Sequence, residues 1–501
     1  MKTNPGSRIT LINMTTGLLL QICLIVSYLV IPRLILNYFG SDANGLVASV
    51  NQLLNYITLV EGGLIAVVTA SMYKPLVNRD AAALSKVIRT AEGFYRKIGI
   101  VFGLYAIVLA IVYPLASGLD FVHTSILILI LAVTNMIRFF IALAYQVLLN
   151  ADKRQYIVNI TQTAVIISGV VLASLSVRFC QSIHLLLGVI GIMYIIQPVV
   201  LISYVRKHYT IDKSAQKDPK LLKERWNGFA INVAFFVHNN TDIVILTVFK
   251  DLLTVSVYSV YAFVTVGIRS IVLSLANGIT PVIGQSYARG DSEELAGKMD
   301  VYEYIIFLIV GFILTIGALL ISPFVMLYTS GIVDADYYQP VFGYLLVAGE
   351  AIHLLKKPQE DLAFAADKFS TVRIPAYIEA ALNIVISLIL VKPLGLAGVA
   401  IGTLVAMIWR LAFHVDLTGR IIKGRGSARY VLKLLLFVLV SAAGFVICRI
   451  FLPVADSGVS VSSWIIHAVL YSVIFAVLYL LLSLVAFRSE LKSVMSYMRR
   501  R

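Results

Sequence analysis

The sequence predicts an all-α, polytopic membrane protein with about 14 transmembrane helices, and three observations support that fold class. Hydrophobic residues make up 59% of the 501 residues and charged residues only 13%, at a mean hydropathy of +0.91. A soluble domain carries about 25% charged residues, so this chain has too few charges to cover a water-facing surface. Long apolar stretches recur along the chain, and basic residues gather in alternate loops.

Apolar stretches of about 18–30 residues, long enough to cross a bilayer, define the expected helices. The first is too long for a signal-peptide core and is expected to remain as a helix. The second, eighth and tenth are long and are expected to tilt, kink or extend beyond the bilayer. The expected spans are 9–32, 43–72, 98–117, 123–149, 156–177, 183–205, 227–249, 254–286, 301–328, 340–366, 372–391, 394–416, 430–452 and 461–486.

The distribution of basic residues predicts the orientation of these spans. With a cytoplasmic N-terminus, thirty of the 41 Lys and Arg residues fall in inner segments and five in outer loops. This bias matches the positive-inside rule. It predicts a protein of the cell (plasma or inner) membrane with both termini on the cytoplasmic side. The net charge of +15 is then explained by topology and anionic lipid headgroups rather than by nucleic-acid binding, because the charges are spread over eight short segments.

Landmarks that recur about 210 residues apart predict an internal repeat. The triplet Ala-Asp-Lys follows the fourth span at 151–153 and the tenth at 366–368, and Pro114 and Pro323 end the third and ninth spans. Six spans separate the paired elements, so the two halves are expected to be parallel repeats, a design found in transporters. The expected organisation is an N-terminal six-helix lobe (1–205), a basic cytoplasmic linker (206–226), a C-terminal six-helix lobe (227–416), and an accessory helix pair with a basic tail (417–501).

Cationic side chains inside the spans are the candidate substrate ligands. Arg138 lies in span four, and Arg269 lies in span eight on a face that also carries Tyr261. An ionised group near the bilayer centre costs about 2.5–3.5 kcal/mol, so something must offset that cost. A hydrated cavity that binds an anionic head group would do so, and guanidinium suits phosphate. Alternatively, either arginine can pair with Glu61 or Asp242 between helices.

Further charged residues leave their roles open. Lys356 and Lys357 are candidate substrate ligands, but each has a carboxylate four residues on that can neutralise it. Arg33, at the outer end of span one, can snorkel or line the outer mouth. Glu61 and Asp242 are candidate ion or proton sites. Arg410 and Lys433 lie near inner helix ends, where snorkelling is expected. Pro358 can kink span ten, and the glycine-rich residues 395–402 favour close helix packing.

Several enzyme and cofactor classes are disfavoured by what the sequence lacks. No GxxxxGK[ST] loop and no HExxH motif occurs. Cys23, Cys180 and Cys448 lie in separate apolar runs without metal-ligand spacing. No soluble segment exceeds about 25 residues by the span assignment, which leaves little room for a catalytic domain. The chain is therefore expected to be neither an enzyme nor a protein with a cofactor or metal.

Five segments resemble one known family of membrane proteins. Residues 37–46 (NYFGSDANGL) and 59–64 (LVEGGL) look like its first hairpin, and 239–245 (NNTDIVI) is similar to its aspartate-containing stretch in span seven. Residues 382–386 (LNIVI) and 393–400 (PLGLAGVA) resemble its eleventh and twelfth helices. The family is the polysaccharide transporters, which include Wzx-type O-antigen flippases, within the multidrug/oligosaccharidyl-lipid/polysaccharide exporter (MATE-like) superfamily.

The resemblance implies a flippase that moves polyprenyl-diphosphate-linked sugars from the cytoplasmic to the outer leaflet by alternating access. It implies membrane lipids and the lipid-linked glycan as partners, and glycan polymerases and glycosyltransferases as further candidates. The alternative is a MATE-like, cation-coupled exporter of small drugs, which would need a cavity of opposite charge. A non-transporting scaffold for glycan-assembly enzymes is a third class.

Overall fold

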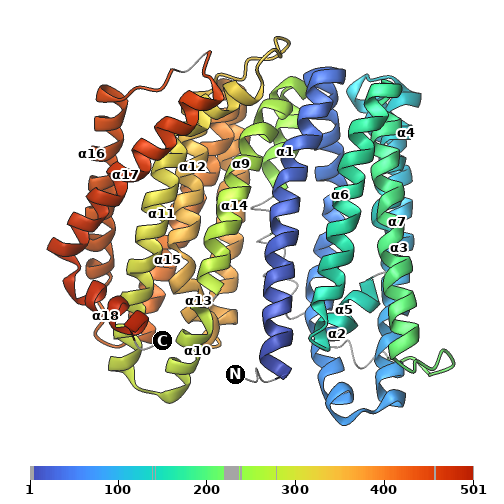
Figure 1. The fold of residues 1–501 in the computed structure, drawn as a ribbon, viewed down its shortest axis with the longest axis horizontal. Helices are drawn as coiled ribbons and strands as arrows, with labels where there is room; N and C mark the ends of the chain where they lie inside the picture. Colours follow the sequence, from blue (N-terminus) through green and yellow to red (C-terminus); the bar gives the residue numbers. More distant parts are fainter. Residues whose placement is uncertain are drawn as a thin grey trace. The chain divides into compact units, whose positions relative to one another are not determined.

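The computed structural model describes residues 5–137, 139–140, 143–218, 236, 240–277, 279–455 and 458–499, and within them the fold is all-helical (Figure 1). The chain forms two compact units, Met1–Phe236 (unit 1) and Val237–Arg501 (unit 2). Unit 1 contains α1 (Pro5–Leu54), the short 3₁₀ helix η1 (Asn55–Ile57), α2 (Thr58–Asn78), α3 (Ala81–Ser117), α4 (Phe121–Ile137), α5 (Leu143–Ala151), α6 (Gln155–Phe179) and α7 (Ile183–His208).

Unit 2 begins with part of span seven and ends with the accessory helices. Its first described helix is Asn240–Phe249. The following helices are α9 (Leu252–Asn277), α10 (Thr280–Arg289), α11 (Ser292–Tyr328), α12 (Pro340–Leu355), α13 (Lys357–Ala365), α14 (Phe369–Leu394), α15 (Leu396–Ile421), α16 (Ser427–Phe451), α17 (Val461–Ala486) and α18 (Arg488–Arg499).

The described helices coincide with most of the expected spans, and the three long spans are broken. Among the described residues, ten helices are long and apolar enough to cross a membrane. One of them unites span one with the start of span two, across Gly40, whose φ of 81° bends α1. Spans two, eight and ten divide at η1, between α9 and α10, and between α12 and α13. The last break lies at Lys356, because Pro358 occupies the first turn of α13, where it lacks an N–H to continue the preceding helix.

The two units contain equivalent elements in the same order. Helices α3 and α11 each span 37 residues, each contains a proline near its end, and each starts from an aspartate cap. The Asp80 side chain accepts a hydrogen bond from the Ala83 N–H, and the Asp291 side chain accepts from the N–H groups of Glu293 and Glu294. Such caps satisfy N–H groups that have no partner within the helix.

Two left-handed turns refine the register of the repeat. Lys153 (φ 60°) lies between α5 and α6, and Asp367 (φ 53°) lies between α13 and α14. In each turn the left-handed residue and its successor donate backbone hydrogen bonds to the end of the preceding helix. Lys153 therefore corresponds to Asp367, which is one residue away from the alignment of the Ala-Asp-Lys triplets.

The same pairs of helices pack within each unit. In unit 1, α6 packs on α7, α3 on α4, α4 on α7, and α2 on α5. In unit 2, the equivalent pairs are α14 on α15, α11 on α12, α12 on α15, and α10 on α13. Each unit thus builds its own helical core, which is the architecture expected of a duplicated lobe.

The segments outside the repeat pack on the units to which they are joined. The first part of the linker (209–218) lies along α3, where the Asp212 N–H donates to Ser85 Oγ at 2.9 Å and the Asp218 N–H to Thr90 Oγ1 at 2.9 Å. Helices α16, α17 and α18 all contact α11 (Figure 1). The accessory pair is therefore part of the compact unit 2.

Helices α14 and α15 pack closely through glycine, as the glycine-rich segment 395–402 predicts. Gly395, with φ 55° and ψ −126°, alone separates α14 from α15. A Cβ atom added to Gly398 would lie 2.2 Å from the Leu390 carbonyl oxygen, and one added to Gly402 would lie 2.2 Å from Ser387 Oγ. Small residues let helix backbones approach in this way within a membrane.

Gly398→Ala should destabilise unit 2, because the new methyl group meets rigid backbone on α14. Overpacking of this kind costs about 1–3 kcal/mol. The measurement is thermal unfolding of the purified protein in detergent. The control is Gly349→Ala on α12, where an added Cβ would meet Thr403 Cγ2 at an ordinary 3.8 Å. Equal unfolding temperatures for the two variants would contradict the close packing.

Candidate functional site

A buried carboxylate on the helix Asn240–Phe249 lies at a junction of four helices of unit 2. Asp242, 5% exposed, accepts hydrogen bonds from the Tyr258 hydroxyl at 3.0 Å and from Thr403 Oγ1 at 3.1 Å. Asn383 Nδ2 donates to Thr403 Oγ1 at 2.8 Å, and Asn383 Oδ1 is buried with no partner among the described residues. A carboxylate surrounded by hydroxyl and amide oxygens can bind a proton or a hard cation.

Arg269 of α9 forms an ion pair within the same unit. Its Nη1 donates to Glu350 Oε1 of α12 at 3.1 Å, and the two side chains are 19% and 12% exposed. Glu350 Oε2 is buried with no partner in the described part of the chain. The partner of Arg269 is therefore a carboxylate that was not among the expected ones, Glu61 and Asp242.

The two lysines at the α12–α13 break pair with carboxylates on the next turn. Lys356 Nζ lies 2.6 Å from Glu360 Oε1, and Lys357 bonds to Asp361. Asp361 also accepts a hydrogen bond from the Tyr302 hydroxyl of α11 at 2.8 Å. The pairing four residues apart that the sequence left open is thus present, and Asp361 joins it to a neighbouring helix.

Arg410 does not snorkel, which corrects the expectation from its place near a helix end. It is 4% exposed, its Nε lies 3.3 Å from Glu379 Oε2, and its Nη1 donates to the Val372 carbonyl at 3.2 Å. Both partners lie on α14, which packs along α15. The guanidinium therefore has acceptors inside the unit and needs no water.

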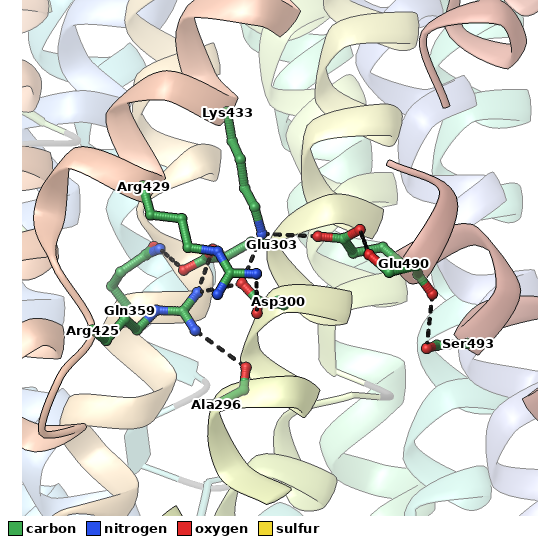
Figure 2. A network of polar contacts seen from close by, with 10 residues as sticks. Ala296, Asp300, Glu303, Gln359, Arg425, Arg429, Lys433, Glu490 and Ser493 are labelled. Carbon is green, nitrogen blue, oxygen red and sulfur yellow. Dashed lines mark hydrogen bonds and ion pairs between the residues drawn. The ribbon is translucent and has the colours of Figure 1, made fainter. Parts of the chain in front are cut away.

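A second charged network joins the accessory helices to α11 (Figure 2). Asp300 accepts hydrogen bonds from Arg425 at 3.0 Å and Lys433 at 2.7 Å, and Glu303 accepts from Arg425 at 2.7 Å. Lys433 also lies 3.1 Å from Glu490 of α18. Lys433 is 7% exposed, so its expected snorkelling is wrong as well.

This network was not predicted because Asp300 precedes the expected start of span nine at 301, Glu303 lies at the very start of that span, and Glu490 follows the last span. The sequence nevertheless contains two signals. Asp300 and Glu303 are three residues apart, and Arg425, Arg429 and Lys433 recur every four residues. Such spacings place charges on one face of a helix. What the sequence does not contain is the packing of α16 against α11.

The remaining predicted site residues have different surroundings. The Tyr261 hydroxyl donates to the Tyr337 carbonyl at 3.0 Å and accepts from the Gln339 N–H at 3.1 Å, and its side chain is fully buried. These bonds favour a role in holding the loop before α12. Arg33 lies in α1 of unit 1 and is partly exposed. Arg138 and the Glu61 side chain lie outside the described residues.

The order, lengths and pairing of the helices define a class, the duplicated all-α folds built from long apolar helices. No family model and no curated protein matches the sequence. Among solved structures, the lipid II flippase MurJ in an inward closed conformation aligns with 93% of this chain and 98% of its own, with a TM-score of 0.71 and 13% identity. The likeness shows that this chain has the MurJ/MATE-like fold.

Two MATE transporters have a similar fold. An inward-facing multidrug resistance MATE family transporter of the MOP superfamily aligns with 80% of this chain and 96% of its own, with a TM-score of 0.62 and 13% identity. A Vibrio cholerae MATE transporter aligns with 83% of this chain and 98% of its own, with a TM-score of 0.57 and 13% identity. The expected fold class is thus confirmed.

Arg425→Ala should destabilise the attachment of α16 to α11. The change leaves the buried Glu303 without its cation, which costs about 1–3 kcal/mol. The readout is the unfolding temperature in detergent. The matched control is Arg420→Ala, whose ion pair with Asp416 has side chains that are 72% and 51% exposed. An exposed pair contributes at most about 1 kcal/mol, so a control that unfolds as early as Arg425→Ala would contradict the network's role.

Proposed function

We propose that this protein is a flippase that moves a polyprenyl-diphosphate-linked oligosaccharide from the cytoplasmic to the outer leaflet by alternating access, for cell-surface polysaccharide synthesis. The observation that carries the proposal is the whole-length likeness to a lipid II flippase, which covers 93% of this chain. The likeness to the MATE family transporter covers 80%. The segment resemblances to the Wzx-type polysaccharide transporters support the same substrate class.

The substrate's diphosphate is the group that the buried cations are suited to bind. A guanidinium presents a planar fork of donors that matches phosphate oxygens, and it keeps its charge in a membrane. Glu350 forms an ion pair with Arg269 at 3.1 Å and so neutralises it. A diphosphate that reaches Arg269 would replace Glu350 as its acceptor. The exchange keeps the arginine paired, and the released Glu350 carboxylate would take up a proton from water, because a low-dielectric site does not hold an unpaired charge. Arg138, Arg33, Lys356 and Lys357 are further proposed ligands.

Asp242 is the proposed coupling residue, with Glu61 as a second candidate. Its carboxylate lies among the oxygens of Tyr258, Thr403 and Asn383, which belong to three other helices. A proton or cation bound there would neutralise the carboxylate and change which of these groups donate to it. Helix packing in unit 2 would then depend on the ion gradient.

The proposed location is the cell membrane, with both termini in the cytoplasm. The basic loops support this orientation under the positive-inside rule. Membrane lipids and the lipid-linked glycan are the proposed partners, together with the glycosyltransferases and polymerase that make and consume the glycan.

Arg269→Ala and Arg138→Ala should each slow flipping about tenfold or more, since a charge-assisted bond to phosphate is lost. The assay uses purified protein in vesicles with a fluorescent polyprenyl-diphosphate oligosaccharide, and an added lectin detects the glycan on the opposite leaflet. The exposed Arg420→Ala serves as the control and should flip at the wild-type rate. Wild-type flipping by both test variants would overturn the diphosphate site. Transport of a cationic dye without flipping would favour the drug exporter.

Asp242→Asn should leave basal flipping measurable but remove its response to an imposed ion gradient, because the amide cannot bind a proton or compensate a cation. Parallel vesicles carry a proton gradient, a sodium gradient or none. Thr247→Val on the same helix is the control, because the Thr247 hydroxyl donates to the Ile243 carbonyl at 2.7 Å and the change leaves the Asp242 carboxylate in place. An undiminished gradient response in Asp242→Asn would exclude this residue from coupling.

A further inference from the structure

One histidine of unit 2 is completely buried, and one of its ring nitrogens has no hydrogen-bond partner among the described residues although charged side chains lie nearby. His414 of α15 is 0% exposed, and its Nδ1 lies 2.9 Å from the Arg410 carbonyl oxygen. A carbonyl can only accept, so Nδ1 carries the hydrogen. In the neutral ring Nε2 then has a free lone pair. Nε2 is buried and has no hydrogen-bond partner among the described residues.

Two other histidines show that the backbone bond alone is not the distinguishing feature. His208 Nδ1 lies 2.9 Å from the Tyr204 carbonyl, and His467 Nδ1 lies 2.8 Å from the Ser463 carbonyl. His208 is exposed and His467 is partly exposed. Of the three, only His414 holds its second nitrogen away from solvent, where a missing partner is costly.

The charges around His414 balance when its ring is neutral. Lys356 and Glu360, at the α12–α13 break, and Arg410 on its own helix act electrostatically on the imidazole. Glu379 of α14 pairs with Arg410 and also interacts with Lys356. The two cations thus face two carboxylates. His353 of α12 is the other titratable group here, and it acts on Glu360.

Protonation of His414 would break this balance. The proton would come from water and bind Nε2, and no other bond would need to form or break. The cluster would gain one positive charge in a membrane-embedded site, where an uncompensated charge is costly. The new N–H would also need an acceptor, and Glu360 is the carboxylate that acts on the ring. Glu360 would then be divided between two cations, so it would neutralise Lys356 less completely.

We propose that His414 is a proton-binding site whose protonation favours binding of an anionic diphosphate to the charge cluster formed by Lys356, Glu360, Glu379 and Arg410. The anion would restore electrical balance. Because Glu360 would then be shared between Lys356 and the protonated His414, Lys356 would be the cation left to bind the diphosphate. This inference deepens the proposed function, because it gives the proposed ligand Lys356 a proton-dependent role. Linkage makes the effect reciprocal: the bound diphosphate must raise the proton affinity of His414.

The first test measures the proton directly. NMR of full-length protein with isotope-labelled histidines, in nanodiscs, follows each imidazole as the pH is varied, and His414→Asn identifies the His414 signal by its absence. Addition of a short-chain polyprenyl-diphosphate sugar should move the His414 titration to higher pH and leave that of His467 in place. A His414 signal that does not move on addition of this probe would overturn the proposal.

The second test measures affinity for the same probe from alkaline to mildly acidic pH. A diphosphate diester has no group that titrates near neutral pH, so its own charge stays constant. Wild-type protein should bind more tightly as pH falls, by up to about tenfold per pH unit, the limit for one linked proton. His414→Asn should lose this slope, and His467→Asn, the matched control, should keep it. Equal slopes in wild type and His414→Asn would overturn the proposal.

The third measurement needs no variant and covers the case in which His414→Asn does not fold. Adding the probe to wild-type protein in weak buffer should cause a net uptake of protons, and no uptake would count against the site. The outcome is separable from the proposed function. If vesicle assays show no flipping but the probe still shifts His414, the proton-linked site stands and the flippase assignment fails.

Discussion

The need to neutralise charge inside a membrane is the constraint on which the structure of unit 2 depends. An ionised side chain near the bilayer centre costs about 2.5–3.5 kcal/mol on insertion scales. The buried or partly buried cations Arg269, Lys356, Arg410, Arg425 and Lys433 each have a carboxylate nearby, from the 2.6 Å pair of Lys356 with Glu360 to the 3.3 Å pair of Arg410 with Glu379. Removal of either partner would leave the other charge uncompensated, which is far more costly than the intact pair is stabilising.

Because most of these partners lie on different helices, neutralisation also determines how the helices pack. Arg269 links α9 to α12, and Arg410 links α15 to α14. Arg425 and Lys433 link the accessory segment to α11 (Figure 2). Glycines at 398 and 402 let α14 and α15 approach closely enough for the Arg410 pair to form. Apolar packing alone would allow sliding of such helices, whereas an ion pair selects one register.

The same constraint gives the proposed transport chemistry its logic. A site with balanced charges can stay in the bilayer without substrate, and an anionic substrate can enter by replacing a carboxylate. Arg269 with Glu350 is suited to such an exchange, because both side chains are partly exposed. The cluster around His414 is deeper, and there a proton would supply the positive charge that the diphosphate neutralises. Asp242, with oxygen partners only, is suited to a cation or a proton instead.

The helices could be predicted from the sequence alone, because hydropathy, proline position and loop charge are local properties. The sequence singled out the three long spans that divide and the repeat, and it offered the pairing of Lys356 with Glu360, one helical turn apart, as one of two possible roles. The ion pairs between distant residues, in contrast, are visible only in the folded chain. Arg410 was expected to reach water, and the carboxylate on α14 that makes this unnecessary is 31 residues away in the chain. Partner choice between helices depends on how they rotate and pack, and no local pattern in the chain contains that information.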